Sequence, residues 1–158
     1  IDATILSLIM GGIILGSLIY NPRLWLPDYP AGVKAKVPPN TPREKREQRL
    51  LMIPFFLVML GGPIYSTYLL RLENGGMLSF LSAYLNIFFV LNIGNLFDAL
   101  VIDLLILTFM KPKFAVIAGA EGMEHLNRDW GMHLKNYVKG VVIMTVFSLP
   151  LAVVSLVV

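Results

Sequence analysis

The chain has 158 residues, of which 56% are hydrophobic and only 15% are charged, and its mean hydropathy is +0.72. A soluble domain rarely carries so little charge, so the composition predicts an integral membrane protein. The absence of cysteine excludes disulfides, thiolate metal sites, iron–sulfur clusters held by this chain and a cysteine nucleophile. The net charge of +3 does not indicate nucleic-acid binding, because the basic residues lie beside apolar segments, where anionic lipid headgroups are the simpler partner.

Four apolar segments are close to or above the length of about 20 residues that a helix needs to cross the hydrocarbon core of a bilayer. They cover approximately residues 3–20, 50–70, 78–110 and 140–158. We therefore expect an all-α integral membrane protein, a single membrane domain over residues 1–158. Its fold should be a four-transmembrane-helix bundle with two long loops, 21–49 and 111–139.

The basic residues predict the orientation of these spans. Of the 13 lysines and arginines, seven lie in loop 21–49, five in loop 111–139 and one in the short turn 71–77. Loops rich in lysine and arginine stay in the cytoplasm, so both long loops are expected there and both termini on the non-cytoplasmic side.

Loop 21–49 begins as a proline-rich segment and ends as a charged lead-in to the second span. Thr41 is a plausible helix N-cap, with Pro42 at the first helical position. Four basic residues of the lead-in are expected to contact anionic lipid headgroups: Arg43, Lys45, Arg46 and Arg49. Arg23, Trp25, Asp28 and Tyr29 could close over a site, but packing, with the aromatic rings as interfacial anchors, is the simpler expectation.

The third apolar segment contains the residues that indicate a function. Asp98 and Asp103 interrupt it together with Asn92 and Asn95, and ionisable groups at membrane depth usually mark ion or proton pathways. At about 100° per residue, Asn92, Asn95 and Asp103 share one stripe of an α-helix. Asp98 lies about 140° from Asp103, so a straight α-helix would not pair the two aspartates unless it broke near Gly94. These four residues are the predicted ion- or proton-binding set, although Asp103 could instead form a structural pair with a base at the membrane boundary.

Loop 111–139 contains both histidines of the chain. If it is helical, Glu121, His125 and Asp129 follow one another at intervals of four residues, with His133 at the edge of the same face. Imidazoles and carboxylates can bind a divalent metal or serve as general acids and bases. Glu121, His125, Asp129 and His133 are therefore a candidate metal site, and His125, His133 and Asp103 are candidate catalytic residues. The simpler interpretation is an amphipathic helix that lies on the headgroups.

Small residues predict where the helices approach each other. Gly12 and Gly16 form a G-x-x-x-G pair, and Gly61, Gly62 and Ser66 give the second span a similar surface. Because no histidine lies in the predicted spans, we do not expect a haem held between helices of this chain alone.

Three functions remain compatible with the sequence. The first is a small transporter or channel protomer, in a homo-oligomer or a larger membrane complex, that uses the third-helix aspartates and asparagines to bind cations or protons. The second is a membrane enzyme, with or without a bound metal, that acts on a lipid or isoprenoid headgroup at the cytoplasmic surface. The third is an accessory subunit whose carboxylates are neutralised by a partner chain.

Overall fold

The computed structural model describes residues 3–157, which form helices and connecting turns without any strand. The long helices are α1 (Ala3–Tyr20), α3 (Pro42–Glu73), α4 (Phe80–Phe97) with its π-helical continuation η2 (Asp98–Met110), and α5 (Trp130–Val157). The short elements are the 3₁₀ helix η1 (Pro22–Asp28), α2 (Ala31–Lys36), and the 3₁₀ turns η3 (Lys113–Ala115) and η4 (Glu124–Arg128). Residues 1, 2 and 158, which belong to the predicted membrane domain, lie outside the described part.

Four helices are long and apolar enough to cross a membrane: α1, α3, the continuous run Phe80–Met110 and α5. Helix α1 matches the predicted span 3–20, α3 and α5 contain the described residues of spans 50–70 and 140–158, and the run Phe80–Met110 begins two residues after the predicted start at 78. This agreement confirms the all-helical fold and the number of candidate spans. The charged lead-in to the second span is part of α3, which at 32 residues is about 48 Å long. Large apolar side chains lie exposed along all four helices, as expected of surfaces that face lipid.

Local sequence explains where these helices begin. Thr41 caps α3 as predicted: its hydroxyl accepts from the backbone N–H of Glu44, the Glu44 side chain accepts from the Thr41 N–H, and Pro42 occupies the first turn. Ser79 caps α4 by accepting from the N–H of Ser82.

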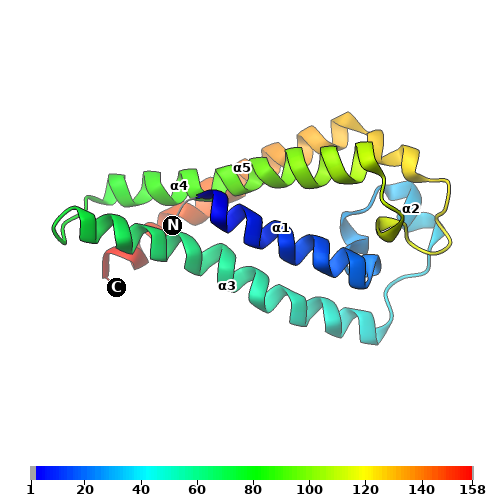
Figure 1. Ribbon diagram of the computed structural model, residues 1–158, viewed down its shortest axis with the longest axis horizontal. Coiled ribbons are helices and arrows are strands. Elements are labelled where there is room, and N and C mark those ends of the chain that lie inside the picture. Colours follow the sequence, from blue (N-terminus) through cyan, green and yellow to red (C-terminus); the bar gives the residue numbers. More distant parts are fainter. Residues whose placement is uncertain (1–2, 158) are drawn as a thin grey trace.

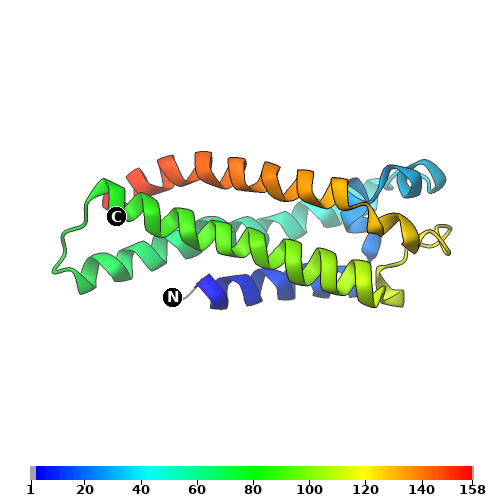
Figure 2. The ribbon, with the colours of Figure 1, turned by 90° about the horizontal axis from the view of Figure 1, so that it is seen from above.

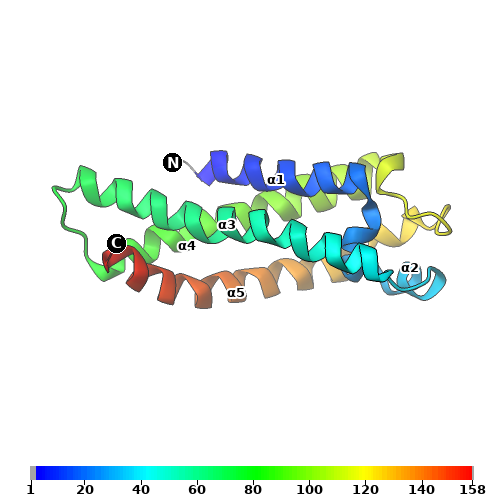
Figure 3. The same cartoon turned by 90° about the horizontal axis from the view of Figure 1, so that it is seen from below.

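The helices form an elongated bundle in which α3 and α4 contact each other (Figure 1). Helices α1 and α5 each pack against both α3 and α4, and Figures 2 and 3 show them on opposite flanks of that pair. The connections 21–41 and 111–129 lie together at one end of the bundle, which we call the loop end. The α3–α4 turn and the C-terminal end of α5 lie at the other end.

The half of the bundle away from the loops holds one packed apolar core, whose buried residues come from α3, α4 and α5: Met59, Ala83, Ile87, Leu91, Leu151 and Ala152. A second buried cluster, made of Ile14, Leu18 and Ile102, joins α1 to η2. Asn86 of α4 donates to the hydroxyl of Thr67 on α3 at 3.0 Å, so a hydrogen bond also joins these two helices inside the bundle.

Glycines allow helices to approach each other closely, but only some of these positions were predicted from the sequence pattern. A Cβ at Gly62 would collide with Leu6 of α1, and one at Gly140 would collide with Asn95 of α4. A Cβ at Gly12 or Gly16 would meet no other described atom within 4 Å. The G-x-x-x-G pair therefore does not mediate helix packing within this chain, whereas Gly62 does.

The loop end has a small core of its own. Leu26, Val33 and Val37 from the first loop pack against Ile117 and Ala120 from the second. Tyr29 reinforces this contact by donating its hydroxyl to the carbonyl of Ala115 at 2.6 Å. The two long loops thus form one folded layer over the end of the bundle.

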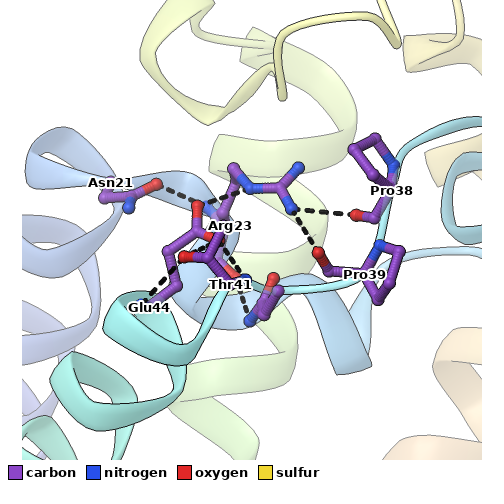
Figure 4. Close-up of polar contacts among 7 residues, drawn as sticks. Asn21, Arg23, Pro38, Pro39, Thr41 and Glu44 are labelled. Atoms are coloured by element: carbon purple, nitrogen blue, oxygen red, sulfur yellow. Dashed lines mark hydrogen bonds and ion pairs between the residues drawn. The ribbon is translucent and has the colours of Figure 1, made fainter.

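An arginine fixes the first loop to the start of α3 (Figure 4). Arg23 donates through Nε to Glu44 at 2.6 Å and through Nη2 to the carbonyls of Pro38 and Pro39 at 2.8 and 3.2 Å. Both side chains of the ion pair are largely buried, with 17% and 13% of their surface exposed. We call this arrangement the Arg23 clamp; it holds η1 and its following residues against the bundle.

Candidate functional site

A cavity of about 410 Å³ extends from the middle of the bundle to the loop end. All four long helices and the first loop contribute to its wall, which is mostly apolar. Its polar lining residues are Ser7, Asp28, Tyr29, Asn95, Asp98, Asp103, Asn127, His133, Asn136 and Lys139. More than a third of the surface of Asp28, Asn136 and Lys139 is exposed, so the polar end of the cavity lies at the surface of the molecule.

The π-helical geometry of η2 places both Asp98 and Asp103 in the wall of this cavity. Hydrogen bonds in a π-helix join residues five apart, so each turn holds on the order of one residue more than an α-turn. Residues at i and i+5, as Asp98 and Asp103 are, therefore lie closer to one face than they would in an α-helix. The expectation that the two aspartates face apart assumed a straight α-helix, and it does not apply because this segment is π-helical. The segment ends at Lys111, whose left-handed backbone (φ 47°) allows its N–H to bond to Ile106.

His133 lies beside Asp103, with its Nδ1 3.6 Å from the carboxylate Oδ2. Its other nitrogen, Nε2, lies 2.6 Å from the backbone oxygen of Asn127. A carbonyl oxygen can only accept, so Nε2 carries a proton and donates it to Asn127. Nδ1 is buried without a hydrogen-bond partner among the described residues. Nδ1 of His133 and the carboxylate of Asp103 therefore face each other as a base and an acid.

Thr108 completes the environment of His133. Its fully buried hydroxyl lies 2.8 Å from the backbone oxygen of Asp103, 3.0 Å from that of Asn127 and 3.2 Å from His133 Nε2. The hydroxyl therefore ties η2 to the segment before α5. These contacts fix the imidazole ring at the cavity wall.

The first loop contributes Trp25, Asp28 and Tyr29 to the cavity, residues for which sequence reasoning preferred packing alone. The carboxyl pKa of Asp28 is raised because the neighbouring elements displace water from it, and the charges of Lys34 and Lys139 partly oppose this effect. Burial also raises the pKa of the Tyr29 hydroxyl. These residues show no periodic pattern in the sequence, because they lie in a proline-rich loop rather than on a helix face.

The asparagines of the predicted stripe take different positions. Asn95 lines the cavity and donates to the backbone oxygen of Tyr137 on α5 at 3.2 Å. Asn92 does not appear in the cavity wall: its amide donates to Phe88 of its own helix, and its Oδ1 is buried without a partner among the described residues. The structure thus brings Asn95, Asp98 and Asp103 together but leaves Asn92 outside.

The helix expected to align the residues of loop 111–139 does not form before Trp130, because the preceding residues make turns and 3₁₀ helices. Gly119 and Gly122 adopt φ values of 89° and 82°, which end any regular helix there. Glu121 accepts from the N–H of Gly119, and this bond together with that from its own N–H lowers its carboxyl pKa. His125 bonds to the Gly122 carbonyl, and Asp129 accepts from the N–H of Met132 at the start of α5.

Of the four residues proposed as metal ligands, His133 alone lines the cavity, while Glu121, His125 and Asp129 lie outside its wall. Within residues 3–157, no group of three or more histidine, aspartate or glutamate side chains is arranged to hold a metal ion. Two of the three candidate catalytic residues, Asp103 and His133, are adjacent, and His125 is not part of their cavity.

The four basic residues proposed to contact lipid headgroups all lie exposed in the first turns of α3: Arg43, Lys45, Arg46 and Arg49. Arg43 also donates to Glu47 at 2.8 Å.

Comparison with known proteins adds no further assignment. No protein-family model, no curated protein and no solved structure matches the chain.

Proposed function

We propose that the protein is a small membrane transporter or channel protomer that binds a cation or protons at the carboxylates of its cavity. The observation that carries this proposal is the convergence of Asp28, Asp98 and Asp103 on one cavity inside an apolar bundle. Carboxylates at membrane depth are costly, and they are typical of ion pathways and proton relays. The described basic groups in the cavity wall are His133 and Lys139, fewer than the carboxylates.

In this proposal the aspartates have different roles. Asp103 and His133 act as an acid–base pair, because Nδ1 of the imidazole faces the carboxylate at 3.6 Å. Asp98 precedes Asp103 by one π-helical turn, and no described base lies within ion-pair distance of it. Asp98 is therefore the carboxylate that accepts an incoming cation or proton. Asp28 lies at the exposed end of the cavity, where its charge attracts cations.

The packed apolar core overlaps the inner end of the cavity, because Met59 and Leu91 belong to both. Transport through a single protomer therefore requires the helices to rearrange at that end, and a path shared with a second protomer would remove the requirement. We retain an oligomeric assembly as part of the proposal.

The Asp103–His133 pair also favours a second candidate function, a membrane enzyme. A carboxylate and an imidazole in contact can act as general acid and base, and the apolar wall beside them suits the chain of a lipid or isoprenoid substrate. This function requires chemical turnover of a substrate and no flux across the membrane.

The test is flux in liposomes that contain the purified protein and a trapped pH-sensitive dye, with imposed proton, sodium or potassium gradients. We expect Asp103→Asn and Asp98→Asn to lower the protein-dependent flux at least tenfold. Glu73→Gln removes one negative charge from an exposed site at the opposite end of the bundle and should leave the flux unchanged. The helical circular dichroism spectrum verifies that each variant is folded. Absence of flux from folded wild-type protein, or undiminished flux in both aspartate variants, would overturn the proposal.

A further inference from the structure

The cavity combines a large apolar wall with carboxylates at one end. Its apolar residues come from all four long helices, and those of α1, α3 and α5 include Met10, Ile14, Phe55, Met59, Ile143 and Met144. The acidic residues Asp28, Asp98 and Asp103 lie toward the loop end. The cavity is thus amphipathic, and a ligand that fills it has an apolar body and a charged or polar group at one end.

The volume of the cavity is larger than a bare ion requires. At about 410 Å³ it lies within the range of about 300–1,000 Å³ that is usual for organic ligands. Inorganic cations such as Ca²⁺ need about six or more oxygen ligands that converge on one point. Since no three of the described carboxylates and histidines are arranged around one point, the geometry favours an organic ligand over a metal ion.

The charge of a suitable ligand follows from Asp98. Among the described residues no base lies within ion-pair distance of Asp98, and Asp103 and Asp28 in the same cavity are also carboxylates. Asp103 has His133 beside it, with Nδ1 3.6 Å from its carboxylate, and Lys34 and Lys139 attract Asp28. An ionised carboxylate without an opposite charge is unfavourable in an apolar surrounding, so a cationic group suits the position next to Asp98.

Aromatic rings in the wall suit the same ligand. Trp25 packs edge-to-face on Phe55 with ring centroids 6.2 Å apart, and its Nε1 donates to Ser17 at 2.7 Å. Both rings line the cavity, and the Trp25 ring is held in place by this hydrogen bond. Faces of tryptophan and phenylalanine attract ammonium groups, which bind them without a fixed hydrogen-bond geometry.

We propose that the cavity binds a lipophilic organic cation, an alkyl or aryl ammonium, with its charged nitrogen at Asp98 and its apolar body against the wall formed by α1, α3 and α5. This inference rests on the proposed function, because it names the cation that the site carries. The ammonium and a proton compete for the Asp98 carboxylate. The other titratable groups of the cavity are Asp28 and Tyr29 from the first loop, Asp103 from η2, and His133 and Lys139 from α5.

The test measures binding of benzyltrimethylammonium to the purified full chain by isothermal titration calorimetry. This probe has a permanent charge, so any change of its affinity with pH reports on the protein. Its neutral isostere, neopentylbenzene, has nearly the same shape without the charge. We expect benzyltrimethylammonium to bind at least tenfold more tightly than neopentylbenzene, and its affinity to fall as the pH is lowered.

Variants connect this binding to Asp98. Asp98→Asn should weaken benzyltrimethylammonium binding at least tenfold, Asp98→Glu should restore it to within about threefold of wild type, and Glu73→Gln should leave it unchanged. If Asp98→Asn does not fold, the Asp98→Glu variant and the pH dependence of the wild-type protein still test the assignment. Equal binding of the neutral isostere, wild-type affinity in Asp98→Asn or no binding to folded wild-type protein would overturn the inference.

Flux measured on the same preparation separates this inference from the proposed function. Proton or sodium flux that depends on Asp98 and Asp103, without ammonium binding, would leave the proposed function intact and remove the organic cation. Ammonium binding without any flux would retain the site and remove the transporter.

Discussion

The Arg23 clamp allows a quantitative test of how the first loop is held over the cavity. Replacing Arg23 with methionine keeps the apolar stem of the side chain but removes the guanidinium, which donates to Glu44 at 2.6 Å and to two proline carbonyls. Glu44 is then left as a largely buried carboxylate without its base. Glu44→Gln removes the charge of the partner and keeps a residue that is still suited to the capping box of α3.

The expected magnitude follows from burial. Breaking a fully buried ion pair costs about 3–5 kcal/mol, whereas an exposed pair contributes about 1 kcal/mol or less. With 17% and 13% of the two side chains exposed, the Arg23 clamp lies nearer the buried limit but is still reached by water. We therefore expect Arg23→Met to lower the free energy of unfolding by about 2–3 kcal/mol. The coupling between positions 23 and 44 in a double-mutant cycle should be about 1–2 kcal/mol.

The chain provides a matched control in Arg43 and Glu47, which form an ion pair of the same chemistry at 2.8 Å. The Arg43 side chain is 83% exposed, so the same cycle at positions 43 and 47 should give a coupling close to zero. Reversible unfolding in mixed detergent micelles, monitored by circular dichroism, measures both cycles. If the coupling at 23 and 44 is no larger than at 43 and 47, burial does not strengthen the Arg23 clamp and the argument is refuted.

Three further predictions test the packing and the electrostatics of the bundle. Gly62→Ala should be less stable than Gly61→Ala by about 1–3 kcal/mol, because only the new Cβ at position 62 collides with the Leu6 side chain of α1. Both substitutions gain the same helix propensity, so equal free energies of unfolding would contradict this packing. Asn86→Ala should cost about 0.6–1.7 kcal/mol because it removes the interhelical hydrogen bonds to Ser66 and Thr67, and Asn92→Ala should cost less because the Asn92 amide bonds only within its own helix. A larger loss for Asn92→Ala in the same unfolding assay would contradict this order. Since the raised pKa of Asp28 makes the folded protein hold its proton more tightly than the unfolded chain, Asp28→Asn should stabilise the protein at neutral pH. The stability gained by Asp28→Asn should fade as the pH falls toward 3.8, the ordinary pKa of an aspartate carboxyl. If the variant is no more stable than wild type at pH 7, the desolvation of Asp28 has no net effect on stability.

Sequence patterns predicted those elements whose signal comes from residues close together in the chain. Helix α1 matches the predicted first span, and the cap at Thr41 with Pro42 is present as expected. The prediction of a helix through Glu121, His125 and Asp129 was wrong, because it relied on spacing in a segment where Gly119 and Gly122 take left-handed conformations and the side chains bond to nearby backbone. Spacing gives a shared face only if the backbone between the residues is helical.

The class of the protein follows from the sequence alone, because hydrophobic runs long enough to cross a bilayer leave helices as the way to satisfy every backbone group in lipid. The sequence also marks Asp98 and Asp103 as unusual, since their cost in an apolar segment does not depend on the fold. Which residues meet depends instead on tertiary packing. The π-helical turn rotates the two aspartates into one cavity, α5 brings His133 to Asp103, and the first loop adds Asp28 and Trp25. These contacts arise between segments far apart in the chain, where packing rather than local periodicity sets the geometry.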